Sequence, residues 1–177
     1  MKIKSLLIPV VTICLFAAIL FGTKTATANT AQANYEAELN TLMLALLPGS
    51  TSFAEEAYDG EDANIKAVYR AENGCVIMTS TYGYAGDLVM LIGVDNGGDV
   101  KGVVVREMSE TYGLGANALS DVDFLAQFLW TEGDAEVGTN VDAITGATVT
   151  SKAVARSVNS AVGFMTGVDA TTSATSW

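Results

Sequence analysis

The spacing of apolar residues predicts a helix followed by a set of β-strands. Within residues 35–49, leucine and methionine recur at intervals of three and four until Pro48-Gly49, which is typical of the buried side of a helix that ends there. Asn73-Gly74 and the segment DNGGD at 95–99 favour hairpin turns. The apolar runs beside these turns, at residues 65–71, 74–82, 88–94 and 100–107, predict strands. We therefore expect an antiparallel meander of about four strands.

Two more helices are predicted after the strands. The first begins with a hydroxyl cap at Ser120 and has acidic residues in its first turn, where the helix dipole favours them. Its buried positions are expected to be Phe124, Leu125, Phe128 and Leu129. The last helix is expected to begin between Thr148 and Ser151 and to end near Gly163 or Gly167. Strands followed by helices predict an α+β fold, in which the sheet packs against helices.

The N-terminal part of the chain predicts a membrane segment. Residues 5–22 carry no charge, and a helix of this length extends roughly 27 Å, close to the hydrocarbon thickness of a bilayer. Lysines before this segment favour a cytoplasmic start. We interpret residues 1–24 as a single-pass anchor in the lipid of a bacterial cell membrane, residues 25–34 as a stalk and residues 35–177 as an extracytoplasmic domain. A cleavable signal peptide is the alternative, because small residues follow the apolar run at the spacing of a cleavage site.

The composition narrows the chemistry of this domain. The chain has no histidine, which excludes a Ser-His-Asp triad and the commonest metal ligand. Cys75 has no partner for an internal disulfide, and its apolar neighbours favour a buried packing role. The chain beyond Lys24 contains six basic residues and all 20 acidic residues, so its net charge is −14. Nucleic acid is therefore a poor partner for it. Solubility is a sufficient explanation for most of these carboxylates.

The segment VDAITGATVTSKAV, residues 141–154, suggests an anion site at the start of the last helix. The first backbone N–H groups of a helix lack internal partners, so they and the helix dipole would stabilise a phosphate attached at Thr148. Lys152 and Arg156 follow at i+4 and i+8, on the same side of a regular helix. An ordinary capped helix with solvated basic residues explains the same pattern, and the pattern does not choose between the two.

The residues Asp142–Ser151, DAITGATVTS, resemble the D-x-x-[ST]-G-A-T-x-[ST] signature of the FMN-binding domain. This domain occurs in the G subunit of the Rnf electron-transport complex and in the C subunit of the sodium-translocating NADH:quinone reductase. The resemblance implies a covalent FMN, joined through its phosphate to the hydroxyl of Thr148 by a flavin transferase. It also implies that Asp142 serves transferase recognition or site geometry. The remaining motif residues of the cofactor site are Thr145, Gly146, Ala147, Thr150 and Ser151. Lys152 and Arg156, which follow the motif, are expected to offset the remaining charge of the phosphate.

Two upstream segments resemble other motifs of the same family. Gly83–Gly86 is similar to its G-Y-x-G sequence, and residues 109–115 are similar to its E-T-P-G-L-G loop, with Tyr112 in place of the proline. The resemblance places a second set of residues beside the flavin ring, namely Glu110, Thr111, Gly113, Leu114 and Gly115. Tyr82 and Tyr84 could stack on the ring, although packing in the core or at its rim is the simpler interpretation.

The function implied by this resemblance is electron relay, not catalysis by residues of the chain itself. The protein would be a membrane-anchored flavoprotein subunit of an Rnf-type ferredoxin:NAD oxidoreductase coupled to ion translocation. Its partners would be the other membrane subunits, with the flavin transferase needed for maturation. Two alternatives stay open. One is a free-standing exported flavoprotein that passes electrons to an extracellular acceptor, and the other is a redox-inert surface module that binds a partner through its acidic face.

Overall fold

The computed structural model describes residue 16, residues 30–109 and residues 119–168 of the chain. The chain divides into two compact units, Met1–Thr41 and Leu42–Trp177. Residues 30–46 are helical, so the helix already includes the last part of the predicted stalk. Within the described ranges, no helix is both long and apolar enough to cross a membrane. The predicted anchor, residues 1–24, lies outside the described residues except for Phe16.

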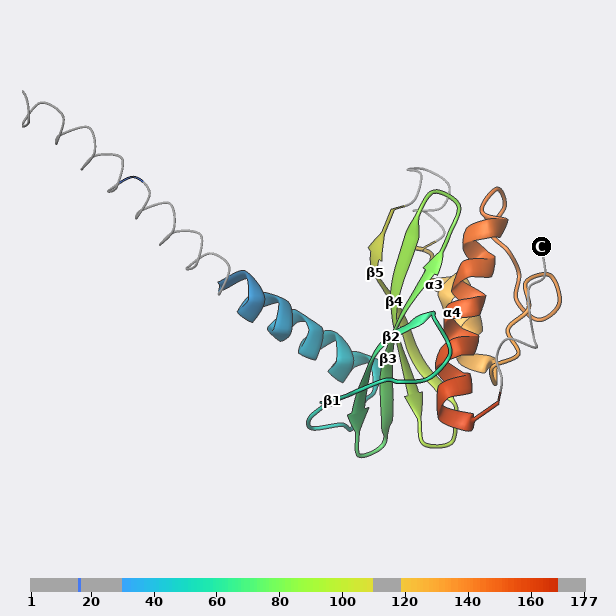
Figure 1. Cartoon of the computed structure of the whole chain (residues 1–177). Helices are drawn as coiled ribbons and strands as arrows, with labels where there is room; N and C mark the ends of the chain where they lie inside the picture. The colour runs from blue at the N-terminus through green and yellow to red at the C-terminus, as the bar shows by residue number, and fades with distance from the viewer. Residues whose placement is uncertain (1–15, 17–29, 110–118, 169–177) are drawn as a thin grey trace, which may run out of the picture. The chain divides into compact units, whose positions relative to one another are not determined.

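The second unit is built around a five-stranded antiparallel sheet whose strands follow one another in chain order (Figure 1). The strands are β1 (Ala54–Glu56), β2 (Ile65–Ala71), β3 (Gly74–Tyr82), β4 (Asp87–Asp95) and β5 (Val100–Met108). This confirms the predicted α+β class and the four expected strands. The meander has one more strand, β1, which pairs with β2 at the edge of the sheet. The residues of β1 are all exposed, so they form no apolar pattern that predicts a strand.

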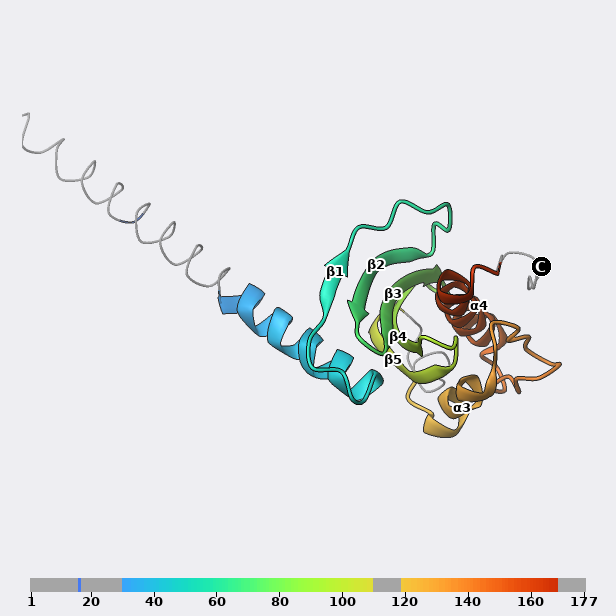
Figure 2. The same ribbon diagram turned by 90° about the horizontal axis from the view of Figure 1, so that it is seen from below.

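The main core lies between the sheet and α4 (Thr148–Thr166), which runs along one face of it (Figures 1 and 2). Alternate residues of each strand point into this core, as the strand period of two requires. The core includes Cys75, Ile77, Met90, Ile92, Val154, Val158 and Ala161, all completely buried. The Cys75 thiol is thus a packing group, and burial, opposed in part by Arg70, raises its pKa above the usual value. Its predicted burial is confirmed.

The opposite face of the sheet receives the end of the helix of residues 30–46. Gly93 and Gly102 are paired across β4 and β5. A β-carbon at Gly93 would lie 2.4 Å from the carbonyl oxygen of Leu46, and one at Gly102 would lie 2.8 Å from a methyl group of that leucine. The two glycines therefore allow Leu46 to pack directly against the strand backbones. Leu46 and Leu47 are buried as the sequence predicted.

The helical segment after the strands has two parts. It consists of α3 (Val122–Ala126) and a 3-10 turn, η1 (Gln127–Trp130), and both contact β5. The cap is Asp121 instead of Ser120, since the Asp121 carboxylate accepts a hydrogen bond of 3.1 Å from the Phe124 N–H. Phe124 and Phe128 are buried edge to face, whereas Leu129 is 36% exposed because the tighter η1 turn rotates it out of the predicted stripe.

The last helix has the predicted ends. α4 begins at Thr148, and Gly167 follows its last residue in the left-handed conformation, with φ of 71°. The Gly167 N–H donates to the Gly163 carbonyl at 2.9 Å, which satisfies one of the helix's terminal acceptors.

Candidate functional site

A tight turn delivers Thr148 to the start of α4. The Ala147 N–H donates to the Ile144 carbonyl at 2.9 Å, which closes a four-residue turn. Gly146 occupies the third position with φ of 81°, a conformation that a type II turn requires and that glycine adopts without strain. Ala147 is buried, whereas Thr145, Gly146 and Thr148 are exposed. The turn therefore presents the Thr148 side chain to solvent.

Ser151 supports this turn from below. Its side chain is completely buried, its hydroxyl donates to the Ala147 carbonyl at 2.9 Å, and the same oxygen accepts from the Ile144 N–H at 3.3 Å. The serine thus ties the first turn of α4 to both ends of the turn before it. The family resemblance groups Ser151 with the cofactor residues, and the geometry gives it a supporting position in that group.

Three amide side chains hold the loop that leads to the turn. Gln127 accepts from the Asp142 N–H at 2.8 Å and donates to the Asp142 carbonyl at 3.4 Å. Asn159 makes the same pair of bonds with the backbone of Ala135, at 2.9 and 3.0 Å. Asn140 accepts from the Glu136 N–H and donates to the Asp134 carbonyl. Sequence analysis missed all three, because two of them bond to backbone groups 15 and 24 residues away.

The start of α4 has no side-chain cap in the described structure. Its N-cap residue is Ala147, which has no hydroxyl or carboxylate to offer the first N–H groups. The Thr150 hydroxyl is buried there without a hydrogen-bond partner among the described residues. Lys152 is half-buried one turn further along, on the same side as Thr148. Donors without acceptors and a nearby cation are the properties expected of a site that receives an anionic group.

Arg156, which the sequence placed beside the phosphate, has a different contact. One of its guanidinium nitrogens donates to the Tyr82 carbonyl at 2.9 Å. Burial lowers the pKa of this guanidinium below its usual value. The side chain is therefore bound at the end of β3, two helical turns beyond Thr148.

The turn between β3 and β4 lies at the same end of the domain as the start of α4 (Figure 1). The Gly83 N–H donates to the Gly86 carbonyl at 2.8 Å, which closes the turn. A β-carbon at Gly86 would lie 2.7 Å from the side chain of Ser109, so the G-Y-x-G turn touches the first residue of the second predicted loop. The remaining residues predicted for that loop, Glu110, Thr111, Gly113, Leu114 and Gly115, lie outside the described residues. The side chains of Tyr82 and Tyr84 are 64% and 69% exposed, so neither is packed in the core.

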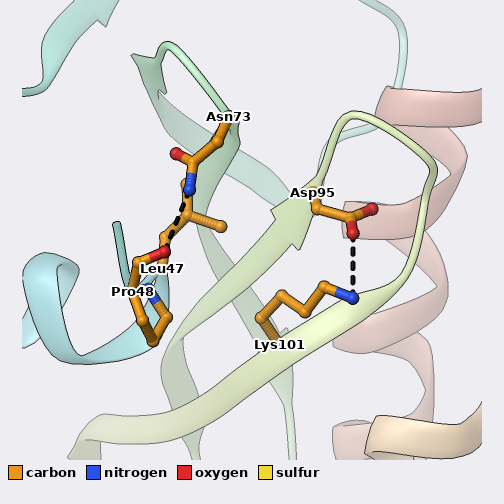
Figure 3. A pocket seen from close by; sticks show the side chains of 5 residues that line it. All are labelled: Leu47, Pro48, Asn73, Asp95 and Lys101. Atoms are coloured by element: carbon orange, nitrogen blue, oxygen red, sulfur yellow. Dashed lines mark hydrogen bonds and ion pairs between the residues drawn. The ribbon is translucent and has the colours of Figure 1, made fainter. Parts of the chain in front are cut away.

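A surface pocket lies elsewhere, at the end of the sheet that carries the β2–β3 and β4–β5 turns (Figure 3). It has a volume of about 350 Å³ and is lined by Leu47, Pro48, Asn73, Asp95 and Lys101. Lys101 is bonded there to Asp95 at 2.8 Å and to Asp99 at 3.1 Å. None of these residues belongs to the motifs that carry the family resemblance, so this pocket is separate from the Thr148 site.

Part of the chain matches a known protein family. Residues 83–163, from the G-Y-x-G turn to the last turns of α4, match the family described as the FMN-binding domain. These residues resemble an FMN-binding domain. Thr148 and the uncapped start of α4 lie within the matched region.

Two curated relatives carry the same resemblance. The chain is 31% identical over 115 residues to the G subunit of the Na⁺-translocating ferredoxin:NAD⁺ oxidoreductase complex of Acetobacterium woodii, covering 60% of this chain and 53% of the relative. It is 38% identical over 94 residues to the G subunit of the proton-translocating ferredoxin:NAD⁺ oxidoreductase complex of Clostridium ljungdahlii, covering 49% and 50%. The chain thus spans about half the length of the curated relatives it matches.

Proposed function

We propose that the protein is a membrane-anchored flavoprotein subunit of an Rnf-type ferredoxin:NAD oxidoreductase complex, with FMN bound as a phosphoester to Thr148. The observation that carries this proposal is the position of Thr148. It is exposed, and it stands at the uncapped first turn of α4 within the matched family region. An exposed hydroxyl on a rigid turn is the acceptor that a modifying transferase requires.

The residues around Thr148 fit the phosphate of FMN. The unpartnered N–H groups at the start of α4 offer hydrogen bonds to phosphate oxygens, and the helix dipole adds a favourable field. Lys152 supplies a positive charge one turn away, in a domain that is otherwise strongly acidic. The buried Thr150 hydroxyl offers another donor. Bound FMN supplies one- and two-electron transfer, and the role of the chain is to hold and orient it.

The other motif residues have supporting roles in this proposal. The exposed Asp142, Thr145 and Gly146 lie on the outer surface of the turn, where a flavin transferase can approach them. Ser151 and Gln127 hold this surface in place. A covalent bond also answers a physical difficulty, because an anionic cofactor on a domain of net charge −14 outside the cell would be lost by repulsion and dilution.

The attachment is tested by expressing the full chain with a flavin transferase in an exporting host. We expect the denatured protein to be fluorescent and heavier by one FMN less one water, and Thr148→Val to abolish both signals. Thr139→Val is the matched control, since Thr139 is exposed in the same loop but outside the motif. An unmodified wild-type protein, beside a control substrate that the transferase modifies, would contradict the proposal and favour the inert surface module.

Membership of a complex is tested separately, by purifying the loaded protein from its native membrane. Recovery of the other membrane subunits with it would support the proposed complex. A loaded protein recovered alone after mild solubilisation would favour the free-standing electron carrier instead.

A further inference from the structure

Hydrogen bonds join the end of β3 to the first half of α4, along a line of contact that we call the seam. The Thr81 hydroxyl donates to the Ala153 carbonyl at 3.0 Å and lies 2.9 Å from the Ser157 hydroxyl. Lower on the strand, Ser80 is bonded to Asn64, whose amide reaches Ser160 at 3.1 Å. Later residues of β3 thus lie beside earlier residues of α4. A chain that leaves β3 at Tyr82 therefore continues toward Thr148.

Arg156 closes this seam at its upper end. It lies two helical turns from Thr148, which corresponds to about 12 Å along the helix axis. Its guanidinium donates to the Tyr82 carbonyl, so the last residue of β3 is held beside α4. The Gly83–Gly86 turn, which follows Tyr82, therefore lies toward the end of the domain where α4 begins. Tyr84 lies in this turn and is 69% exposed.

We infer that Arg156 is a positioning residue, which holds the Gly83–Gly86 turn so that the Tyr84 ring lies against the isoalloxazine ring of FMN attached at Thr148. The inference rests on the proposed attachment. The ribityl chain of FMN separates its ring from its phosphate, so the ring can reach across the gap between Thr148 and the turn. A largely exposed tyrosine is suited to such a contact, because one face of an aromatic ring can stack on another. On α4, Lys152 and not Arg156 is then the cation that serves the phosphate.

Two features of Arg156 fit a clamp better than a phosphate ligand. Its guanidinium is partly buried and already donates to a backbone carbonyl, which a phosphate ligand on a solvated helix face need not do. Its partner is the last residue before the turn that the Gly83–Gly86 hydrogen bond closes. Loss of the clamp should therefore move Tyr84 while leaving Thr148 in place.

The test compares flavin fluorescence in full-length, transferase-loaded protein, with each sample referred to its own urea-denatured state. A tyrosine ring in contact with isoalloxazine quenches its fluorescence, so the folded wild-type protein should be dimmer than the denatured one. Tyr84→Leu should raise the folded signal toward the denatured value. Arg156→Met, which keeps the length of the side chain but not its donors, should raise it as well. Arg156→Lys, which keeps one donor, should restore quenching at least in part, and it also serves if Arg156→Met fails to fold.

The double variant separates positioning from charge. If Arg156 acts through the turn, Arg156→Met should add nothing to the fluorescence of Tyr84→Leu, whereas independent effects would add. Lys101→Met is the control for net charge, because it removes one positive charge at the other end of the sheet, beside the β2–β3 and β4–β5 turns.

Intact mass separates the attachment of FMN at Thr148 from the positioning role of Arg156. Full loading in Arg156→Met with unchanged fluorescence would overturn the positioning role but not the attachment. Additive effects of Arg156→Met and Tyr84→Leu would overturn it as well. Absence of flavin from the wild-type protein would overturn the attachment, and the positioning role with it.

Discussion

The buried amide of Asn159 should be a main support of the loop that carries Thr148. Its side chain is 3% exposed and bonds both backbone groups of Ala135, which is itself completely buried. Asn159→Ala would leave one buried N–H and one buried carbonyl without these partners. A buried backbone group left in this state costs about 1–3 kcal/mol, so the two together should lower the free energy of unfolding by about 3 kcal/mol.

Asn140→Ala provides the matched control. Asn140 makes the same two kinds of bond, to the Glu136 N–H at 2.8 Å and the Asp134 carbonyl at 3.0 Å, but it is exposed. Water can replace both bonds there, so its loss should cost about 1 kcal/mol or less.

Urea unfolding of the full chain, followed by circular dichroism, measures both variants. The midpoint should fall strongly for Asn159→Ala and slightly for Asn140→Ala, with an unchanged slope in each case. Amide exchange at Ala135 should also accelerate in the first variant only. Equal losses of stability would refute the reasoning, because burial is the only difference that it uses.

Two further predictions concern the turn and the acidic hairpin. Gly146→Ala and Gly138→Ala each place a side chain at positive φ, 81° and 92°, and each should cost about 1–2 kcal/mol in thermal unfolding. Only Gly146→Ala should also reduce flavin loading, since Gly138 lies outside the turn before α4; equal loading in both would contradict the role given to the turn. For Asp95, burial raises the pKa, but the bond to Lys101 and the hairpin N–H donors outweigh it, so the pKa lies below its ordinary value of 3.8. The Asp95 carboxylate therefore stabilises the folded state at neutral pH, and this stabilisation is lost as acid protonates the carboxylate. Asp95→Asn should reduce the stability that the protein loses between about pH 6 and about pH 3 by up to about 1 kcal/mol. An unchanged acid dependence in urea titrations would exclude this contribution.

Much of the fold follows from local sequence because its elements carry strong local signals. Alternating apolar residues and glycine-containing turns located β2 to β5, and Gly167 marked the end of α4. β1 has no such signal, since its three residues are exposed and it exists through pairing with β2. The cap at Asp121 shows the usual uncertainty of one residue, because Ser120 and Asp121 are both good capping residues.

The place of the motif in the fold was predictable from the sequence, and the contacts that hold the motif were not. The sequence D-x-x-T-G-A-T indicated Thr148, and the structure places this threonine at the first position of α4. It could not indicate that Ser151 bonds beneath the turn or that Arg156 reaches Tyr82, since these contacts depend on how α4 meets the loop and β3. Side-chain amides and guanidinium groups have many possible partners, and only the folded backbone selects one.

The glycine pair on the open face of the sheet also bears on where the domain can be cut. Leu46 packs against the backbone at Gly93 and Gly102, where no side chain stands in its way. Residues 42–47 belong to the second unit of the chain. A truncated chain that started at β1 would lose the contact of Leu46 with Gly93 and Gly102. Crystallisation or electrochemistry on the isolated domain would therefore be best served by an N-terminus placed before residue 42.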